Sequence, residues 1–356
     1  MTTPAWLIYG ANGYTGELIA REAAQRGLTP ILAGRKRAVI EALAVELGLE
    51  SRIFGLDDPK VIAASLNDCA VVLHCAGPFS RTAKPMIEAC LLTHTHYLDI
   101  TGEIAVFEMA ASYDAVAQLA NVMLLPGVGF DVVPTDCVAA QLKAQLPTAT
   151  HLTLALRGLG PMSRGTTLTG LEGMSTGGTV RRDGKLIPVP TAWKTRYIDF
   201  GNGRGPTATV TIPWGDVSTA YYTTGIPNIE VYLAFKKWSR RFIKLSRYFH
   251  WLLGSAPVQS YFRSQVKLMP RGATPEQRAR STSYVWGEVR DDGGRAVTLR
   301  IATPDGYTLT VLTALTIVEQ ALSGPQGGHH PIGFQTPAKA YGSDLIFTLP
   351  GVTRLP

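Results

Sequence analysis

The stretch from Leu7 to Gly27, LIYGANGYTGELIAREAAQRG, decides the fold of this chain. A short apolar run ends at Gly10, and Gly13 and Gly16 follow at three-residue spacing, before an amphipathic helical pattern. The first glycine permits a tight turn after a strand, the second lets backbone approach a pyrophosphate, and the third allows close helix–strand contact. The free N–H groups of the helix start favour an anion there. The residues predicted to hold a dinucleotide are Gly10, Ala11, Asn12, Gly13, Tyr14, Thr15 and Gly16.

Composition indicates a globular protein of two domains. The chain has 356 residues, of which 46% are hydrophobic and 17% charged, and its formal net charge is +7. No stretch of about 18 uncharged apolar residues predicts a transmembrane helix. The first residues lack a basic region and lead directly into the glycine motif, so we expect a first strand rather than a signal peptide. Four cysteines without a CxxC pair favour reduced thiols in a cytoplasmic protein.

The order of predicted elements indicates an α/β fold. Up to about residue 125, short apolar strands alternate with helical patterns, which is typical of a Rossmann-type, doubly wound parallel sheet. After about Ala149, β-branched and alternating stretches closely punctuated by Gly and Pro predict a second α+β domain on a mostly antiparallel or mixed sheet, and we include the run 295–322 among them. The predicted domains are an NADP-binding domain over 1–130, a substrate and dimerisation domain over 131–330, and a C-terminal segment over 331–356 that packs back on the first domain.

The end of the second predicted strand indicates which dinucleotide is bound. Sites for NAD place an Asp or Glu about 20 residues after the glycine loop, where it bonds the ribose 2′-hydroxyl. This sequence has AGRKR there instead, with Arg35, Lys36 and Arg37 in the place of the acid. A guanidinium can grip a 2′-phosphate through two hydrogen bonds. We therefore predict NADP(H) as the cofactor, with Arg35 and Lys36 at the phosphate.

Motifs along nearly the whole chain resemble the saccharopine dehydrogenase-like oxidoreductases, in particular the branch of trans-acting enoyl reductases. They are YGANGYTG, LAGR, HCAGPF, ACLLTHTHYLDITGE, PGVGFDVVPTD, TGIPNIEVY and GFQTPAKAYG. The resemblance implies an N-terminal Rossmann domain, a mixed α/β substrate domain and a homodimer. It does not fix the substrate, and the sequence has no evident cluster of cations for clamping the carboxylates of an amino acid.

Loops after the predicted strands supply the candidate active site, because ligands of open parallel sheets lie beyond the carboxyl ends of the strands. A reductase also needs a proton donor, and four residues are candidates by position. Each has a structural alternative. Tyr97 can be part of the hydrophobic core, and Asp99 can cap a turn. Glu103 can interact with the dipole of a helix, and Asp131 can hold its loop by accepting backbone N–H groups. The further residues predicted to line the cofactor are Ala76, Gly77, Pro78, Gly102, Gly129 and Phe130.

Two other features bear on ligands and partners. His94 and His96 lack a third ligand at a recognisable spacing, so we predict no metal site. The segment 235–254 is basic and aromatic, which suits a peripheral contact with a membrane, the edge of a substrate entrance, or a helix packed on the sheet or on a partner subunit; of these we favour packing. No nucleic-acid-binding motif accompanies the charge, so we predict no nucleic-acid partner.

Three functions fit the sequence. The first is an NADPH-dependent oxidoreductase that reduces a C=C or C=N bond of a lipophilic or polyketide-like small molecule. The second is an NADP(H)-binding scaffold or sensor without turnover. The third is a dehydrogenase of an imine derived from an amino acid. An apolar site beside the nicotinamide with a proton donor in reach would favour the first of them.

Overall fold

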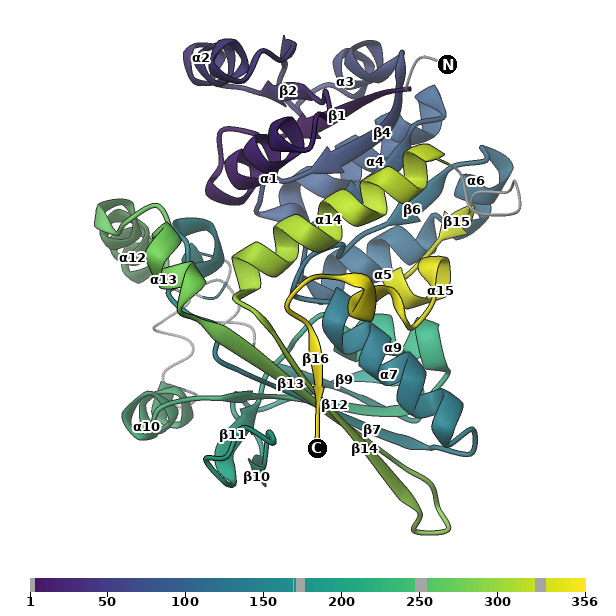
Figure 1. Cartoon of the computed structure of the whole chain (residues 1–356), viewed down its shortest axis with the longest axis vertical. Helices are drawn as coiled ribbons and strands as arrows, with labels where there is room; N and C mark the ends of the chain where they lie inside the picture. The colour runs from purple at the N-terminus through teal and green to yellow at the C-terminus, as the bar shows by residue number, and fades with distance from the viewer. Residues whose placement is uncertain (1–3, 169, 171–176, 247–254, 324–330) are drawn as a thin grey trace. The chain divides into compact units, whose positions relative to one another are not determined.

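A computed structural model of the whole chain describes residues 4–168, 170, 177–246, 255–323 and 331–356 (Figure 1). The chain divides into two compact units, and each is made of two separate segments of the sequence. The first unit contains Met1–Val133 and Leu309–Tyr341, and the second contains Pro134–Thr308 and Gly342–Pro356.

A seven-stranded sheet forms the centre of the first unit, and all its neighbouring strands are parallel. Its middle strands are apolar on both faces, as expected where helices cover both sides. The strand order reverses between β1 and β4, which is the doubly wound arrangement. In spatial order the strands are β15 (Gly333–Phe334), β6 (Met123–Leu125), β5 (His96–Asp99), β4 (Cys69–His74), β1 (Ala5–Tyr9), β2 (Ile31–Gly34) and β3 (Ser51–Ile53).

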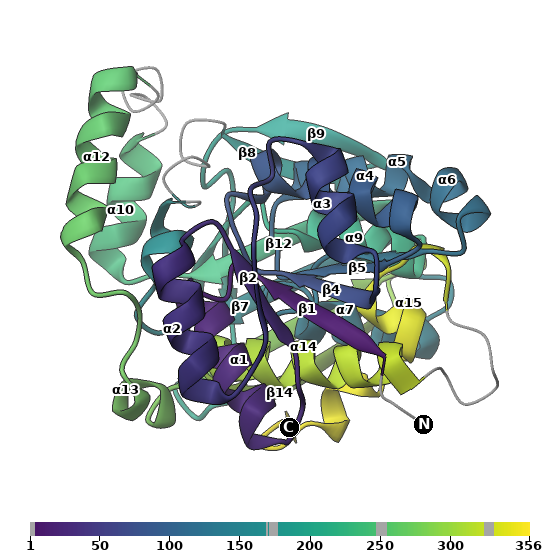
Figure 2. The same ribbon diagram turned by 90° about the horizontal axis from the view of Figure 1, so that it is seen from above.

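Helices connect these strands and cover the sheet. Figure 2 shows α3, α4 and α5 on one face of the sheet and α1 and α14 on the other. The apolar side of α1 is fully buried through Ile19, Ala20 and Ala23, so the helical periodicity of the opening stretch predicts its packing correctly. The helices are α1 (Tyr14–Gln25), α2 (Arg37–Leu47), α3 (Pro59–Leu66), α4 (Phe79–Thr93), α5 (Ile104–Ser112), α6 (Asp114–Leu119), α14 (Gly306–Ser323) and α15 (Pro337–Tyr341).

The second unit is built on a nine-stranded mixed sheet. Only β12 and β7 pair in parallel among its described strands; the other pairs are antiparallel. The main path runs β10 (Thr195–Ile198), β11 (Thr207–Thr211), β12 (Asn228–Ala234), β7 (His151–Arg157), β13 (Thr282–Arg290), β14 (Ala296–Pro304) and β16 (Thr353–Leu355), while β8 (Gly178–Arg182) pairs with β12 and with β9 (Lys185–Val189). The described helical segments with assigned bounds are α7 (Val133–Gln145), α9 (Asp216–Thr224), α10 (Lys237–Ser246), α12 (Ala256–Leu268), α13 (Pro275–Ala279) and the 3-10 turn η1 (Leu345–Thr348).

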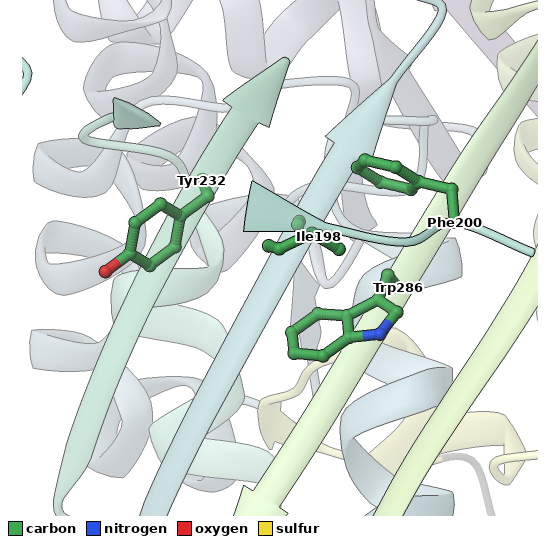
Figure 3. Close-up of a cluster of buried hydrophobic side chains, with 5 residues drawn as sticks. Ile198, Phe200, Tyr232 and Trp286 are labelled. Carbon is green, nitrogen blue, oxygen red and sulfur yellow. The ribbon is translucent and has the colours of Figure 1, made fainter. Parts of the chain in front are cut away.

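The end strand β10 folds over one face of the sheet to which it belongs. Ile198 and Phe200, at and just beyond the end of β10, join a buried cluster with Trp286 of β13 and Tyr232 of β12 (Figure 3). Three strands separate β10 from β13 in the sheet, so the sheet must curl for these side chains to meet. An ion pair of 2.8 Å between Arg196 of β10 and Glu288 of β13 closes the same approach.

The C-terminal third of the chain differs from the predicted domain division. We expected the run 295–322 to be strands of the second domain, but only Ala296–Pro304 is a strand and Gly306–Ser323 is the helix α14. Its β-branched residues are tolerated in a helix because the helix is buried, with Val311, Ile317 and Val318 in the core, and packing overrides their preference for strands. Asp305 accepts the N–H of Tyr307 (3.0 Å) at the start of the helix.

The predicted segment 331–356 is likewise divided between the units. Its first part belongs with the parallel sheet, where β15 pairs with β6 and α15 follows. Its last part belongs to the second unit, because β16 pairs with β14. Each part thus adds the end strand of a different sheet.

The described part of the chain contains no helix long and apolar enough to cross a membrane. Within the basic aromatic segment, α10 covers 237–246, while residues 247–254 lie outside the described residues. Trp238 is largely exposed, so this residue does not pack on the chain's own sheet, and the packing that we favoured stays a prediction for a partner subunit.

Candidate cofactor-binding site

The glycine loop has a shape that side chains would prevent. Gly10 has a positive φ of 85°, and a β-carbon there would lie 2.8 Å from Cβ of Ala76. A β-carbon on Gly16 would lie 2.4 Å from the carbonyl oxygen of Gly10, closer than any real contact. Gly13 is less crowded, at 3.2 Å from that oxygen. The first and third glycines therefore have the turn and close-packing roles that the spacing predicts.

No side chain of the N-cap residue covers the start of α1. Gly13 is its extended N-cap residue and offers no side-chain cap to the first N–H groups. Ala11 is buried, whereas Asn12, Tyr14 and Thr15 are half-buried on the helix start. Backbone N–H groups at a helix start are a ready site for a phosphate. The residues present thus fit a dinucleotide.

The end of β2 carries the predicted phosphate clamp. A β-carbon on Gly34 would lie 3.0 Å from Oδ1 of Asn12, so the amide of Asn12 lies beside the end of β2. Arg35 and Lys36 are exposed, and no carboxylate of the described residues forms an ion pair with either. Arg37 differs, because its guanidinium pairs with Glu41 at 2.7 Å. Two of the three cations are therefore available to an incoming phosphate.

The loop after β4 is fixed by hydrogen bonds that the sequence did not reveal. His74 is fully buried, and its Nε2 lies 2.9 Å from Oγ1 of Thr82. The Thr82 hydroxyl donates to the carbonyl of Ala76 (2.7 Å), so the proton between the ring and the hydroxyl belongs to His74. Burial lowers the pKa of His74 to about 3, which keeps the ring neutral. The pair thereby holds Ala76 against Gly10, while Gly77 and Pro78 continue the loop to α4.

Glu103 is a cap for the helix that follows this loop. Its two carboxylate oxygens accept the N–H groups of Phe79 and Ser80, each at 2.9 Å. These are the first residues of α4, so the carboxylate accepts N–H groups that have no partner within the helix and interacts favourably with the positive end of the helix dipole. Glu103 was predicted either to donate a proton or to interact with a helix dipole, and the geometry supports the second, structural role. The helix concerned, however, begins 24 residues upstream.

Tyr97 and Asp99 form a buried pair at the end of β5. The Tyr97 hydroxyl donates to Oδ2 of Asp99 at 2.6 Å, and both residues are fully buried. Oδ1 of Asp99 accepts the N–H groups of Thr101 and Gly127, each at 2.9 Å. Burial raises the pKa of Asp99 to about 6, and these hydrogen bonds oppose the rise. Asp99 thus ties the loop after β5 to the loop after β6.

Asp131 lies in the loop after β6, beside the loop after β5. A β-carbon on Gly102 would lie 2.8 Å from Oδ2 of Asp131, so this glycine leaves the room that the carboxylate occupies. The Asp131 side chain is partly exposed, and burial raises its pKa to about 6. With this pKa roughly a tenth of the carboxyl is protonated at pH 7, far more than for an ordinary aspartate.

Helix α14, from a distant part of the sequence, forms hydrogen bonds with the loop after β6. The N–H of Phe130 donates to Oγ1 of Thr310 (3.0 Å), and the hydroxyl of Thr313 donates to the carbonyl of Val128 (2.7 Å). A β-carbon on Gly129 would lie 3.0 Å from Cγ2 of Thr310. No pattern in the sequence indicates these threonines, because the contacts join residues about 180 positions apart.

The predicted site residues of the parallel sheet therefore converge on one edge. The loops that follow β1, β2, β4, β5 and β6 all leave from the carboxyl ends of strands that are neighbours in this order. His94 and His96 lie elsewhere, at the start of β5, where each bonds to backbone: His94 Nδ1 with the carbonyl of Ala120 (2.8 Å) and His96 Nδ1 with the N–H of Met123 (3.1 Å). All four cysteines are free thiols.

Comparison with known proteins identifies the domain that carries this site. Residues 6–125 match the family model of the saccharopine dehydrogenase NADP-binding domain. The resemblance seen in the sequence motifs is confirmed, and so is NADP as the cofactor type of the domain.

Named relatives and a solved structure agree with this assignment. A saccharopine dehydrogenase-like oxidoreductase of Bos taurus is 31% identical over 150 residues, which cover 36% of this chain and 35% of the relative. A trans-acting enoyl reductase of Mycobacterium tuberculosis is 30% identical over 144 residues, covering 38% of this chain and 34% of that protein. This chain thus matches about a third of the length of these curated relatives.

The similarity in fold to a solved structure extends beyond the NADP-binding domain. Saccharopine dehydrogenase (L-Glu forming) of Saccharomyces cerevisiae aligns over 97% of this chain and 96% of its own length, with a TM-score of 0.64 and 13% sequence identity. At this identity the likeness concerns the fold. The predicted fold class, a Rossmann-type parallel sheet with a second mixed-sheet α+β domain, is confirmed.

Proposed function

We propose that this protein is an NADPH-dependent oxidoreductase that reduces a C=C or C=N bond of a lipophilic or polyketide-like small molecule. The observation that carries the proposal is the crowding of the glycine loop, where a β-carbon on Gly10 would meet Ala76 and one on Gly16 would meet Gly10, at the start of a helix without a side-chain cap. The name of the enoyl reductase relative supports a C=C bond as the group reduced. The cofactor supplies the hydride.

The residues of the chain have separable tasks in this proposal. The backbone from Gly10 to Gly16 would bind the pyrophosphate, and Arg35 with Lys36 would bind the 2′-phosphate. Ala76, Gly77 and Pro78 would border the nicotinamide half, together with the loops that contain Gly102, Gly129 and Phe130. His74, Thr82 and Asp99 would orient these loops without touching a ligand.

Asp131 is the proton donor that the geometry supports best among the four candidates. Tyr97 and Asp99 are fully buried and bonded to each other, and Glu103 is engaged with the N–H groups of α4. Asp131 is a partly exposed residue, and burial of its carboxyl raises the pKa to about 6. A group with a pKa near the working pH can both hold and release a proton efficiently. The carboxyl of Asp131 would therefore protonate the atom next to the one that accepts hydride.

The test is the rate of NADPH oxidation with α,β-unsaturated thioesters and with cyclic imines as acceptors, followed by absorbance. We expect Asp131→Asn to bind NADPH as the wild type does and to lose at least about 100-fold in turnover, the range found for general acids. Glu103→Gln serves as the matched control and should retain turnover, because it keeps an acceptor for the α4 N–H groups.

The outcomes separate the proposed function from its alternatives. Consumption of enoyl acceptors supports the reductase of lipophilic substrates, and consumption of imines alone would favour the amino-acid-imine dehydrogenase. If the protein binds NADPH but no acceptor oxidises it, the result would favour the scaffold or sensor without turnover. Full turnover in Asp131→Asn would contradict the assignment of the proton donor while leaving the reductase intact.

A further inference from the structure

The positive charge of the protein is concentrated in one part of its second unit. Between Glu230 and Glu276 the sequence contains no acidic residue. The nine cations in this stretch exceed the net charge of +7 for the whole chain, so the remainder carries −2. The cations are Lys236, Lys237, Arg240, Arg241, Lys244, Arg247, Arg263, Lys267 and Arg271. Such a field attracts an anionic partner.

The helices in this stretch also expose large apolar side chains. On α10, Trp238 is 71% exposed, and on α12, Tyr261 and Leu268 are 61% and 79% exposed. Tyr261 and Leu268 are seven positions apart, which places them on the same face of α12 two turns apart. Val266 is only 4% exposed, so α12 is packed on one side and open on the other.

We propose that α10 and α12 bind the surface of an anionic phospholipid bilayer. Basic helices that carry aromatic and aliphatic side chains lie in the interface, with the apolar groups among the headgroups and acyl chains and the cations at the phosphates. Trp and Tyr prefer this depth, and each Lys or Arg near the surface adds to the attraction. In both views α10 and α12 lie at the left of the picture, and in Figure 1 they are separate, α12 above the start of β13 and α10 below it (Figures 1 and 2).

The charge distribution argues against the main alternative occupants. In a symmetric dimer the same stretch occurs on both subunits, and its nine cations without an acid between them disfavour contact with a second copy across a two-fold axis. A nucleic acid would satisfy the cations and could stack on Trp238 and Tyr261. It would leave Leu268, the most exposed of the three, without a matching surface, whereas acyl chains provide one.

The experiment is cosedimentation of the full chain with vesicles of phosphatidylcholine alone and of phosphatidylcholine with phosphatidylserine, at low and at high salt. We expect binding to the anionic vesicles only, weakening as salt rises. Arg240→Glu with Arg241→Glu should lower the partition coefficient at least about tenfold, because two cations are replaced by two anions. The matched control is Lys185→Glu with Arg204→Glu, an equal charge change at exposed cations outside the stretch.

Trp238→Ala distinguishes a membrane from other anionic partners. It should weaken binding to anionic vesicles about tenfold while leaving the net charge unchanged. The proposal is overturned by a lack of binding at low salt, by an equal loss in the control pair, or by vesicle binding that is insensitive to Trp238→Ala. A dimer that dissociates in Trp238→Ala would assign the surface to a second copy. NADPH affinity should be the same in all these variants, so this test stands apart from the proposed function.

Discussion

The loop after β1 and the loop after β5 lie at the same edge of the parallel sheet, but they are shaped in opposite ways. The loop from Gly10 to Gly16 has its conformation because side chains are missing, since a β-carbon on either end glycine would meet neighbouring atoms within 3 Å. The loop from Asp99 to Glu103 has its conformation because side chains are present, and their carboxylates accept four backbone N–H groups between them. The carboxylates of the second loop accept the protein's own N–H groups, whereas the first loop provides no side-chain cap to the start of α1.

The difference shows what a residue type at a strand end indicates. Polar residues after a parallel strand reliably lie at the binding edge of the sheet. Whether they act on a ligand depends on the donors that the neighbouring loops leave unsatisfied, and a sequence does not list these. Four substitutions can break or sharpen this comparison.

The largest effect is expected at Gly10. Gly10→Ala combines a positive φ with a methyl group 2.8 Å from Cβ of Ala76, so we expect a loss of about 3 kcal/mol in the free energy of unfolding and loss of NADPH binding. The matched control is Gly27→Ala, which also has a positive φ of 75° but meets nothing within 4 Å. It should lose about 1 kcal/mol and bind NADPH normally. Equal losses in the two variants, measured by denaturant unfolding, would contradict the crowding argument.

A smaller effect is expected from the charge of Asp99. Its pKa rises from 3.8 to about 6 on folding, so between these values the folded protein binds a proton that the unfolded chain does not. Its contribution to stability therefore falls as pH rises through this window, by roughly 2–3 kcal/mol. Asp99→Asn keeps an oxygen for the N–H groups of Thr101 and Gly127 and should remove this share of the pH dependence.

The measurement for Asp99 is the difference in unfolding free energy between the variant and the wild type at pH 4 and pH 7. Asp131 has a pKa raised in the same direction, so Asp131→Asn should remove a second, independent share. A difference that does not change with pH in Asp99→Asn would mean that Asp99 is charged in the folded protein as freely as in water.

The capping role of Glu103 predicts a loss of stability rather than of chemistry. Glu103→Ala leaves the N–H groups of Phe79 and Ser80 without their side-chain acceptor and should lower the free energy of unfolding by roughly 1–2 kcal/mol. Glu103→Gln should recover about half of this loss, because one oxygen remains. Thermal unfolding of the two variants provides the measurement. If Glu103→Ala kept its stability but lost turnover, Glu103 would instead be a catalytic residue.

The smallest effect is expected at the 2′-phosphate. Arg35→Ala should weaken NADPH binding about tenfold and leave NADH binding unchanged, since it removes a charge-assisted contact that only the phosphate makes. Arg37→Ala is the matched control two residues away, where the guanidinium already pairs with Glu41. Fluorescence titration of both variants with both cofactors decides the matter, and equal losses in the two would place the phosphate elsewhere.

The sequence predicts local features of this protein well. The strand, glycine loop and helix from Leu7 to Gly27 follow from spacing and periodicity, and the positions of Asp99, Glu103 and Asp131 at one sheet edge follow from strand order. The helix α14 was missed because a run of threonine and valine is typical of strands, while its hydroxyl bonds, such as Thr313 to Leu309, occur only once the helix exists.

The roles of the site residues are less predictable because they depend on distant partners. Glu103 caps a helix that starts 24 residues earlier, and Thr310 holds Phe130 from 180 residues away. His74 was not a candidate at all, since one histidine in an apolar strand has no pattern to mark it. These contacts are set by how the chain returns to the same sheet edge, and a single sequence does not record them.

The most direct test of the account is the affinity of the wild-type protein for NADPH and NADH, titrated by fluorescence at one fixed ionic strength. The crowded glycine loop followed by Arg35 and Lys36 predicts that NADPH binds at least about tenfold more tightly, since one charge-assisted contact of this kind contributes about 1.5–3 kcal/mol. Equal affinities, or tighter binding of NADH, would contradict the assignment of the cation pair at the end of β2 to the 2′-phosphate.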